Sequence, residues 1–149
     1  AGFYTRAVRR EQTNEPAKIA DLRILLVEDN EVNKHVTSAM LQQCGFKPDV
    51  ASDGFTALQA ATAQDYHLIL MDISMPGMDG CECTRRIRAA GRPWRPQILA
   101  LTAGALAADH ARCMDAGMDG VLTKPMVLSE LRRVLREVAT HWSQRTVGS

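Results

Sequence analysis

Three carboxylates follow predicted buried strands and could act together in chemistry. Glu28 and Asp29 come directly after the apolar run 22–27, and Asp72 comes directly after the run 68–71. The carboxyl ends of parallel strands meet at one edge of a sheet, where ligands of such folds bind. We therefore expect the three carboxylates to lie close together.

Two further polar side chains follow strands in the same way. Thr102 ends the segment 97–102, and Lys124 comes directly after the run 120–123. The hydroxyl group can donate a hydrogen bond to a phosphoryl oxygen, and the ammonium group supplies a fixed positive charge. We expect both at the edge that holds the carboxylates.

The expected carboxylate cluster needs a positive partner, because like charges held together keep some carboxyl groups protonated. Mg²⁺ binds carboxylate oxygens, keeps several waters and shares its shell with phosphate groups. With such an ion and Lys124 stabilising the equatorial oxygens, Asp72 could attack a phosphorus atom. The product would be an aspartyl phosphate.

Each of these residues also has an ordinary structural explanation. Glu28 and Asp29 could be acids near a helix N-terminus, and Asp72 could cap a loop. Thr102 could be a helix N-cap, and Lys124 could be a surface residue. The separate structural explanations would require several coincidences at one edge of one sheet. A shared function explains the five residues together better.

Pro125 follows the lysine directly. An X-Pro bond adopts the cis form far more readily than other peptide bonds. A cis Lys124–Pro125 bond would aim the lysine inward, and an ordinary trans bond would simply join a strand to a helix. The sequence leaves both possibilities open.

The elements that must position these groups alternate along the chain. Short apolar runs predict strands, and segments with helical spacing of apolar residues predict helices. The predicted strands are 22–27, 47–51, 68–71, 97–101 and 120–123, and the predicted helices are 31–45, 54–64, 80–90, 105–117 and 128–140. Continuous apolar strands joined by helices predict an α/β fold, a doubly wound sandwich around a parallel sheet.

Apolar residues at helical spacing predict which helix faces pack on the sheet. The expected buried stripes are Val32, Val36, Met40 and Cys44 in the first helix, Phe55, Leu58 and Ala61 in the second, and Leu128, Leu131, Leu135 and Val138 in the last. A stretch with five arginines and no acid, Arg85–Arg95, is interpreted as a solvated face rather than a docking patch.

The bulk composition fits one ordinary globular domain. The chain has 149 residues, is 46% hydrophobic and carries a net charge of +1, so its charge does not point to nucleic acid or a membrane surface. The polar, aperiodic segment 1–20 is expected to be a linker or tail, residues 21–141 the domain, and residues 142–149 a C-terminal tail. With neither a membrane span nor a signal peptide recognised, we expect a cytoplasmic domain whose parent protein could be membrane-anchored.

Four motifs together resemble the response-regulator receiver domain of two-component signalling. They are "ILLVEDN", "LILMDISMPGMDG", "ALTA" and "VLTKP", and the resemblance covers about residues 22–140. It implies a flavodoxin-like (βα)5 sandwich with a five-stranded parallel sheet in the order 2-1-3-4-5.

The resemblance also implies a role for each site residue. Asp72 would be the phosphoacceptor, and Glu28 and Asp29 would join it in binding Mg²⁺ or Mn²⁺. The backbone carbonyl of Ser74 would complete the protein ligands of the metal. Lys124 would pair with the phosphorylated aspartate.

The resemblance implies a switch as well. Thr102 would be the switch hydroxyl, acting on a surface for an output protein or a dimer contact formed by the segments 105–117, 120–123 and 128–140. Many family members carry an aromatic switch residue where this chain has Val121. A short β-branched side chain has no comparable rotamer swing, which puts this readout in doubt.

The implied partner is a histidine kinase or a histidine-phosphotransfer domain, whose phosphohistidine donates the phosphoryl group. The wording "VEDNEVNKHV" is similar to receivers of hybrid sensor histidine kinases. The domain would be an acceptor with slow autodephosphorylation and not an enzyme, with no nucleic acid or membrane partner. The alternative is a degenerate receiver that acts only as an interaction module.

An aspartate-nucleophile phosphatase would need an acid two residues after the nucleophile to protonate the leaving group. That position is Ser74, which cannot do this, so the phosphatase interpretation is disfavoured.

Overall fold

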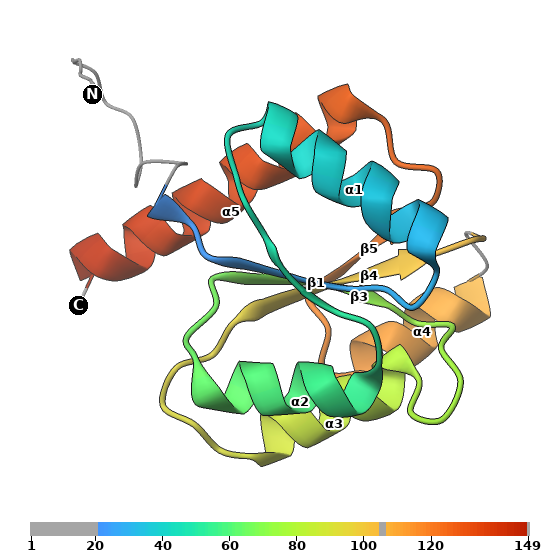
Figure 1. Ribbon diagram of the computed structural model, residues 1–149. Helices are drawn as coiled ribbons and strands as arrows, with labels where there is room; N and C mark the ends of the chain where they lie inside the picture. The colour runs from blue at the N-terminus through green and yellow to red at the C-terminus, as the bar shows by residue number, and fades with distance from the viewer. Residues whose placement is uncertain (1–20, 105–106, 149) are drawn as a thin grey trace.

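The computed structural model describes residues 21–104 and 107–148, and its centre is a parallel five-stranded sheet (Figure 1). The strand order is β2-β1-β3-β4-β5, which confirms the predicted order 2-1-3-4-5. The strands are β1 (Ile24–Val27), β2 (Asp49–Ala51), β3 (Leu68–Asp72), β4 (Gln97–Thr102) and β5 (Gly120–Thr123). The central strand β3 pairs with β1 and β4, so Asp72 ends the strand in the middle of the sheet.

Helices cover both faces of the sheet. They are α1 (Glu31–Gln43), α2 (Gly54–Ala63), α3 (Gly80–Ala89), α4 (Ala107–Ala116) and α5 (Leu128–Gly148). In Figure 1, α1 and α5 lie on one face, and α2, α3 and α4 lie on the other. This is the doubly wound sandwich that the alternating pattern predicts.

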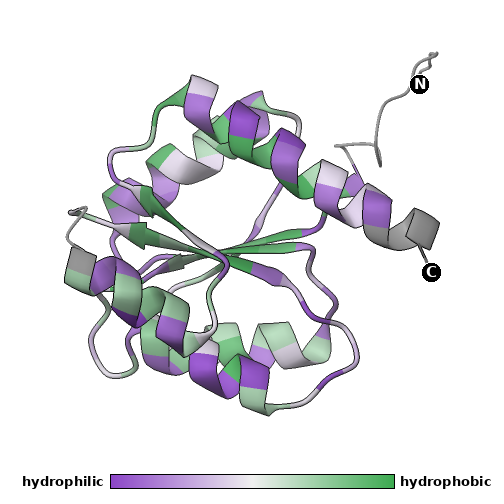
Figure 2. Ribbon diagram, turned by 180° about the vertical axis from the view of Figure 1, so that it is seen from behind, coloured by the Kyte–Doolittle hydropathy of each residue, from purple (hydrophilic) through white to green (hydrophobic). Residues whose placement is uncertain are grey.

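Two apolar cores result, one on each face of the sheet, and β3 contributes to both. Ile69 and Met71 pack with α2, α3 and α4, whereas Leu68 and Leu70 pack with α1 and α5. Successive side chains of a strand point to opposite faces, so a strand buried on both faces must be apolar throughout. Figure 2 shows the strands as a hydrophobic band between helices with mixed surfaces.

Side-chain caps fix where three helices begin. Asn30, Asp53 and Asp79 each accept a hydrogen bond from the backbone N–H three residues later, at 2.9, 2.7 and 2.8 Å. Such caps satisfy N–H groups that have no partner within the helix. The caps of α1 and α3 therefore set the loops that follow Glu28 and Asp72.

The predicted buried stripe of α1 is right for Met40 and Cys44, which pack against the core, and wrong for Val32 and Val36. Val32 and Val36 are 69% and 52% exposed, and the helix instead buries Thr37 and Leu41. In α2 the prediction holds for Ala61, which is buried, and for Leu58, which packs against the core, but it is wrong for Phe55, which is 59% exposed. Apolar residues at helical spacing also occur on the outer face of these helices, so spacing alone does not separate the exposed residues from the buried ones.

The last helix is longer than predicted, and the expected tail from residue 142 is wrong. α5 continues to Gly148. Trp142 is only 6% exposed and packs in the core beneath α1 and α5. The other predicted flank, residues 1–20, lies outside the described residues. None of the described helices combines the length and the hydropathy needed to cross a membrane.

The arginine-rich stretch Arg85–Arg95 is only partly a solvated face. Arg88 donates to the carbonyl oxygens of the residues that precede β4 and β5, and it pairs with Asp119 at 3.0 Å. Arg92 donates to two carbonyl oxygens at the end of α2. These two arginines tie together loops at the amino ends of the strands.

Candidate functional site

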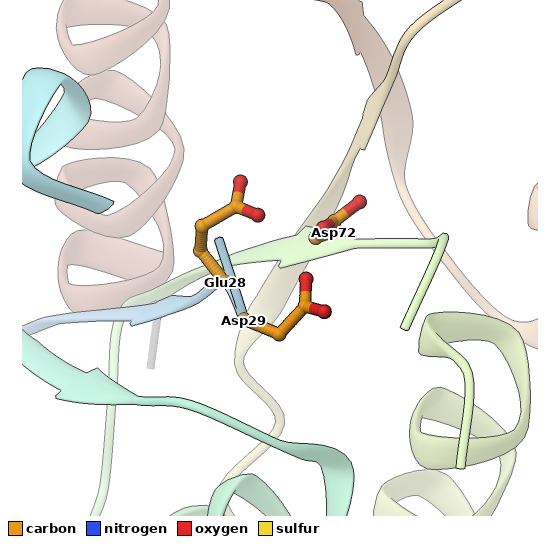
Figure 3. A group of neighbouring side chains, drawn as sticks. All are labelled: Glu28, Asp29 and Asp72. Carbon is orange, nitrogen blue, oxygen red and sulfur yellow. The ribbon is translucent and has the colours of Figure 1, made fainter. Parts of the chain in front are cut away.

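Three carboxylates meet beyond the carboxyl ends of β1 and β3. Glu28 follows β1 and is fully buried, Asp72 ends β3 and is 2% exposed, and Asp29 is more exposed than either. One carboxylate oxygen from each lies within 4.8 Å of the others. Figure 3 shows the three carboxyl groups gathered at this edge of the sheet. The parallel pairing of Val27 with Met71 brings the two strand ends together.

Lys124 reaches the same place from the end of β5. Its Nζ lies 3.3 Å from Glu28 Oε1 and 3.4 Å from Asp72 Oδ1. The backbone N–H of Lys124 donates to the carbonyl oxygen of Thr102 at 2.7 Å, which holds the lysine beside the end of β4. The Lys124–Pro125 peptide bond is cis.

Two backbone amides also donate to the buried carboxylates. The N–H of Asn30 donates to Glu28 Oε2 at 3.2 Å, and the N–H of Ser74 donates to Asp72 Oδ1 at 3.1 Å. These donors stabilise the charged forms. The sequence analysis missed both amides, because only the geometry of the turns aims them at the carboxylates.

The charges of the site are not balanced by its own side chains. One ammonium group faces three carboxylates, and two of the carboxylates are buried. A hard divalent cation with oxygen ligands fits this donor set, because it would offset the excess negative charge. The carboxylate oxygens of the predicted ligands Glu28, Asp29 and Asp72, which lie within 4.8 Å of one another, are close enough to share one such ion.

The electrostatics of Asp72 reflect this imbalance. Burial raises the pKa of Asp72 to about 6, and its interaction with Glu28 acts in the same direction. The N–H of Ser74 and the charge of Lys124 act in the opposite direction, lowering the pKa. A bound cation would lower this pKa further, because it favours the charged carboxylate.

Thr102 ends β4 and is buried, but its hydroxyl group is engaged with the following loop. It donates to the carbonyl oxygen of Gly104 at 2.8 Å and accepts from the N–H of Gly104 at 3.2 Å. The structure therefore holds the hydroxyl against its own loop. Val121 is partly buried and packs against the core on the α2–α4 face.

Two glycines let the loop around the site close tightly. A Cβ on Gly80 would overlap the carbonyl oxygen of Asp72 and lie 2.8 Å from Ile73 Cα. A Cβ on Gly54 would lie 2.8 Å from the carbonyl oxygen of Met78. The sequence analysis missed these two contacts, because each depends on a neighbour that only the three-dimensional structure shows.

Comparisons with known proteins agree with this geometry. The family model "Response regulator receiver domain" matches residues 24–136. The receiver domain of the sensor histidine kinase PA1611 from Pseudomonas aeruginosa is 44% identical, with a TM-score of 0.73 over 79% of this chain and 97% of that chain. That structure has a magnesium ion coordinated in its active site cleft.

Further relatives are much longer than this chain. Hybrid signal transduction histidine kinase L of Dictyostelium discoideum is 34% identical over 89% of this chain, and sensor histidine kinase RcsC of Salmonella typhi is 36% identical over 77%. The chain spans only 8% and 12% of these two relatives. A structure of a Saccharomyces cerevisiae complex, the Ypd1 phosphotransfer protein with the Ssk1 receiver domain, matches with a TM-score of 0.73, 26% identity and coverage of 82% of this chain and 91% of that chain.

The family match covers well over half of the chain, and the fold and the acid cluster agree with it. The chain belongs to the response-regulator receiver domain family, the phosphorelay domains of two-component signalling.

Proposed function

We propose that this receiver domain accepts a phosphoryl group from a phosphohistidine onto Asp72. The observation that carries the proposal is the buried Asp72 carboxylate, with Lys124 Nζ at 3.4 Å and two further acids within 4.8 Å. Lysine is the side chain here that can neutralise an added phosphoryl oxygen, and the acids are suited to a cation that neutralises the others.

In the proposed reaction a carboxylate oxygen of Asp72 attacks the phosphorus atom of the phosphohistidine. The new bond is O–P, the bond that breaks is P–N, and the electron pair of that bond returns to the imidazole. Lys124 stabilises the charge on the phosphoryl oxygens in the transition state. The N–H of Ser74 donates to Asp72 Oδ1, which leaves the second carboxylate oxygen for the attack.

The proposed metal ligands are Glu28, Asp29, Asp72 and the backbone carbonyl of Ser74. The proposed ion is Mg²⁺, and Mn²⁺ prefers similar oxygen ligands. Such an ion supplies positive charge against the phosphoryl oxygens. The magnesium ion in the related receiver of PA1611 supports this assignment.

The proposed switch begins at Thr102. A phosphoryl group on Asp72 brings negative charge and strong acceptor oxygens. The Thr102 hydroxyl would therefore break its hydrogen bonds with Gly104 and donate to a phosphoryl oxygen instead. The loop before α4 would follow, with a coupling on the order of 1–3 kcal/mol. The readout would be an output protein or dimer contact on the α4–β5–α5 face, and Val121 would transmit it without an aromatic swing.

The proposed partner is a histidine kinase or histidine-phosphotransfer domain, and the proposed parent is a hybrid sensor histidine kinase. The hybrid kinases among the relatives and the Ypd1–Ssk1 receiver complex support this assignment. In that setting residues 1–20 would be a linker, and the domain itself would lie in the cytoplasm and act as an acceptor rather than an enzyme.

The test is incubation of the chain with a small phosphodonor such as acetyl phosphate, with and without Mg²⁺, followed by intact-mass measurement. We expect one added phosphoryl group that depends on Mg²⁺. Asp72→Asn should show none, because the amide is not a nucleophile for phosphorus.

Asp115→Asn is the matched control, because Asp115 is an exposed carboxylate on α4 outside the acid cluster. It should be labelled like the unchanged chain. Labelling that persists in Asp72→Asn would overturn the assignment of the acceptor. An unlabelled wild-type chain would instead support the interaction module.

A further inference from the structure

The two tryptophans of the chain form a stacked pair at the end of the molecule opposite the acid cluster. The ring centroids of Trp94 and Trp142 are 4.6 Å apart, with an interplanar angle of 14°. Trp94 lies in the loop between α3 and β4, and Trp142 lies on α5. Their Nε1–H groups donate to two consecutive carbonyl oxygens, those of Tyr66 and His67, at 2.7 and 3.0 Å.

The imidazole ring of His67 packs beside this pair. It lies 5.3 Å from the Trp94 centroid and 5.0 Å from the Trp142 centroid, nearly perpendicular to both rings. Nearly equal distances place the imidazole beside the stack rather than on the outer face of one ring. His67 therefore contacts α5 and the α3–β4 loop at once.

His67 also holds the segment through which the chain enters the domain. The backbone N–H of Arg23 donates to His67 Nδ1 at 2.9 Å, and the backbone N–H of His67 donates back to the Arg23 carbonyl oxygen at 2.9 Å. The first of these bonds requires Nδ1 to be unprotonated. A neutral His67 thus joins the start of the domain, just before β1, to its last helix.

Among the residues that the structure describes, the charged groups around His67 do not supply a strong partner for a proton. Burial lowers the pKa of His67, and the nearby Arg23 side chain acts in the same direction, against Asp21 and Asp65. Neither of these acids has a hydrogen bond to the imidazole. Asp65 instead pairs with Arg92 at 2.7 Å.

The other elements packed on His67 also present ionisable groups. On α5, His141 contacts the Trp142 ring at a centroid distance of 5.6 Å. In the loop that carries Trp94, Arg95 pairs with Asp119 at 3.3 Å. Within the described residues, neither element brings a carboxylate to the imidazole, so a proton on His67 would break the Arg23 bond without a compensating ion pair from them.

We propose that His67 is a proton-sensitive latch between the Arg23 backbone and the Trp142 end of α5. The latch is closed when the imidazole is neutral and opens when the imidazole is protonated. The latch lies before the amino end of β3, whereas Asp72 lies at its carboxyl end. It would set how the Arg23 backbone is held against the Trp142 end of α5, and acid would release that contact.

The test measures hydrogen exchange of the Arg23 amide together with circular dichroism of the stacked indoles between about pH 7.5 and about pH 5. Because the chain has two tryptophans and both belong to this cluster, their exciton couplet reports on the stacked pair beside His67. We expect the Arg23 protection factor to fall at least about tenfold in acid, with a midpoint below about 6.5. The couplet should weaken over the same range, while the amide of Leu70 stays protected.

His67→Asn is the decisive variant, because its Oδ1 can accept from the Arg23 N–H but does not titrate. We expect protection at neutral pH to remain and the acid response to disappear. His141→Asn removes the other imidazole that contacts Trp142, and it should respond to acid like the unchanged chain.

The measurement is repeated in Asp72→Asn, because Asp72 also titrates near pH 6. Persistence of the response there would assign it to the latch whatever the outcome for phosphoryl transfer. A response that vanishes in Asp72→Asn or in His141→Asn, or that survives in His67→Asn, would overturn the proposal.

Discussion

Asp72 is a carboxylate whose charged form is disfavoured by its own site. Its pKa of about 6 lies above the ordinary value of about 3.9, so the folded chain binds more protons than the unfolded chain between these pH values. The free energy of unfolding therefore decreases as the pH rises through this window. Without metal, Asp72→Asn should stabilise the protein by about 1–2 kcal/mol at pH 7, and the gain should disappear near pH 4.

Urea unfolding with a chelator at about pH 4, 5.5 and 7 measures this effect. Asp115→Asn provides the comparison, since it removes an exposed carboxylate that lies outside the acid cluster. Adding Mg²⁺ should stabilise the unchanged chain but have much less effect on Asp72→Asn. A stabilisation of Asp72→Asn that is the same at every pH would refute the role of the raised pKa.

The acids and the lysine of the site could be predicted because each is attached to the end of a strand. Once the strands are known to be parallel, the position of Glu28, Asp72 and Lys124 at one edge follows from topology. The engagement of Thr102 with Gly104 does not follow, because it depends on the conformation of a loop. The same holds for the Ser74 amide that donates to Asp72.

At the scale of elements, the start of α3 is packed against the backbone that carries Asp72. A Cβ on Gly80 would overlap the Asp72 carbonyl oxygen and crowd Ile73 Cα, which are backbone atoms that cannot move aside independently. Gly80→Ala should therefore destabilise the protein by about 1–3 kcal/mol. It should also weaken Mg²⁺ binding, because relief of the overlap displaces the carboxylate. Chemical denaturation measures the loss of stability, and a Mg²⁺ titration followed by backbone amide NMR shifts measures the weaker binding.

Gly104→Ala is the control for this prediction, because none of the described residues beyond its chain neighbours lies within 4 Å of a Cβ at that position. Its stability should change by less than about 0.5 kcal/mol. If both alanine variants behaved alike, the effect would belong to glycine substitution in general and not to the contact with Asp72.

The elements themselves were predictable, but their packing was less so. The positions of strands and helices follow from alternating apolar runs, and the strand order follows from the family resemblance. The exposed row of Val32 and Val36, however, has the same spacing as the buried row of Thr37 and Leu41. A threonine in the buried row weakens the pattern that indicates it. The extension of α5 was missed because Trp142 finds its partners, Trp94 and His67, far away in the sequence.

At the scale of the whole molecule, β3 joins two cores that otherwise lie on opposite faces of the sheet. Leu70 faces α1 and α5, and its neighbour Met71 faces α2, α3 and α4; both are fully buried. Loss of packing on one face therefore loosens the strand that supports the other face. Domains of this size usually unfold in one transition, and this shared strand gives a physical reason for it here.

Leu70→Ala and Met71→Ala should each destabilise the protein by about 2–5 kcal/mol, because each leaves a cavity in one core. Val36→Ala, at a position that is 52% exposed, should change stability by less than about 0.5 kcal/mol.

Tryptophan fluorescence reports on the face of α1 and α5, where Trp142 packs, and far-ultraviolet circular dichroism reports on all helices. The two signals should keep one midpoint in every variant, even when Met71→Ala alters the opposite core. A fluorescence midpoint that stays in place while circular dichroism shifts would show that the two faces unfold separately, and β3 would then not couple them.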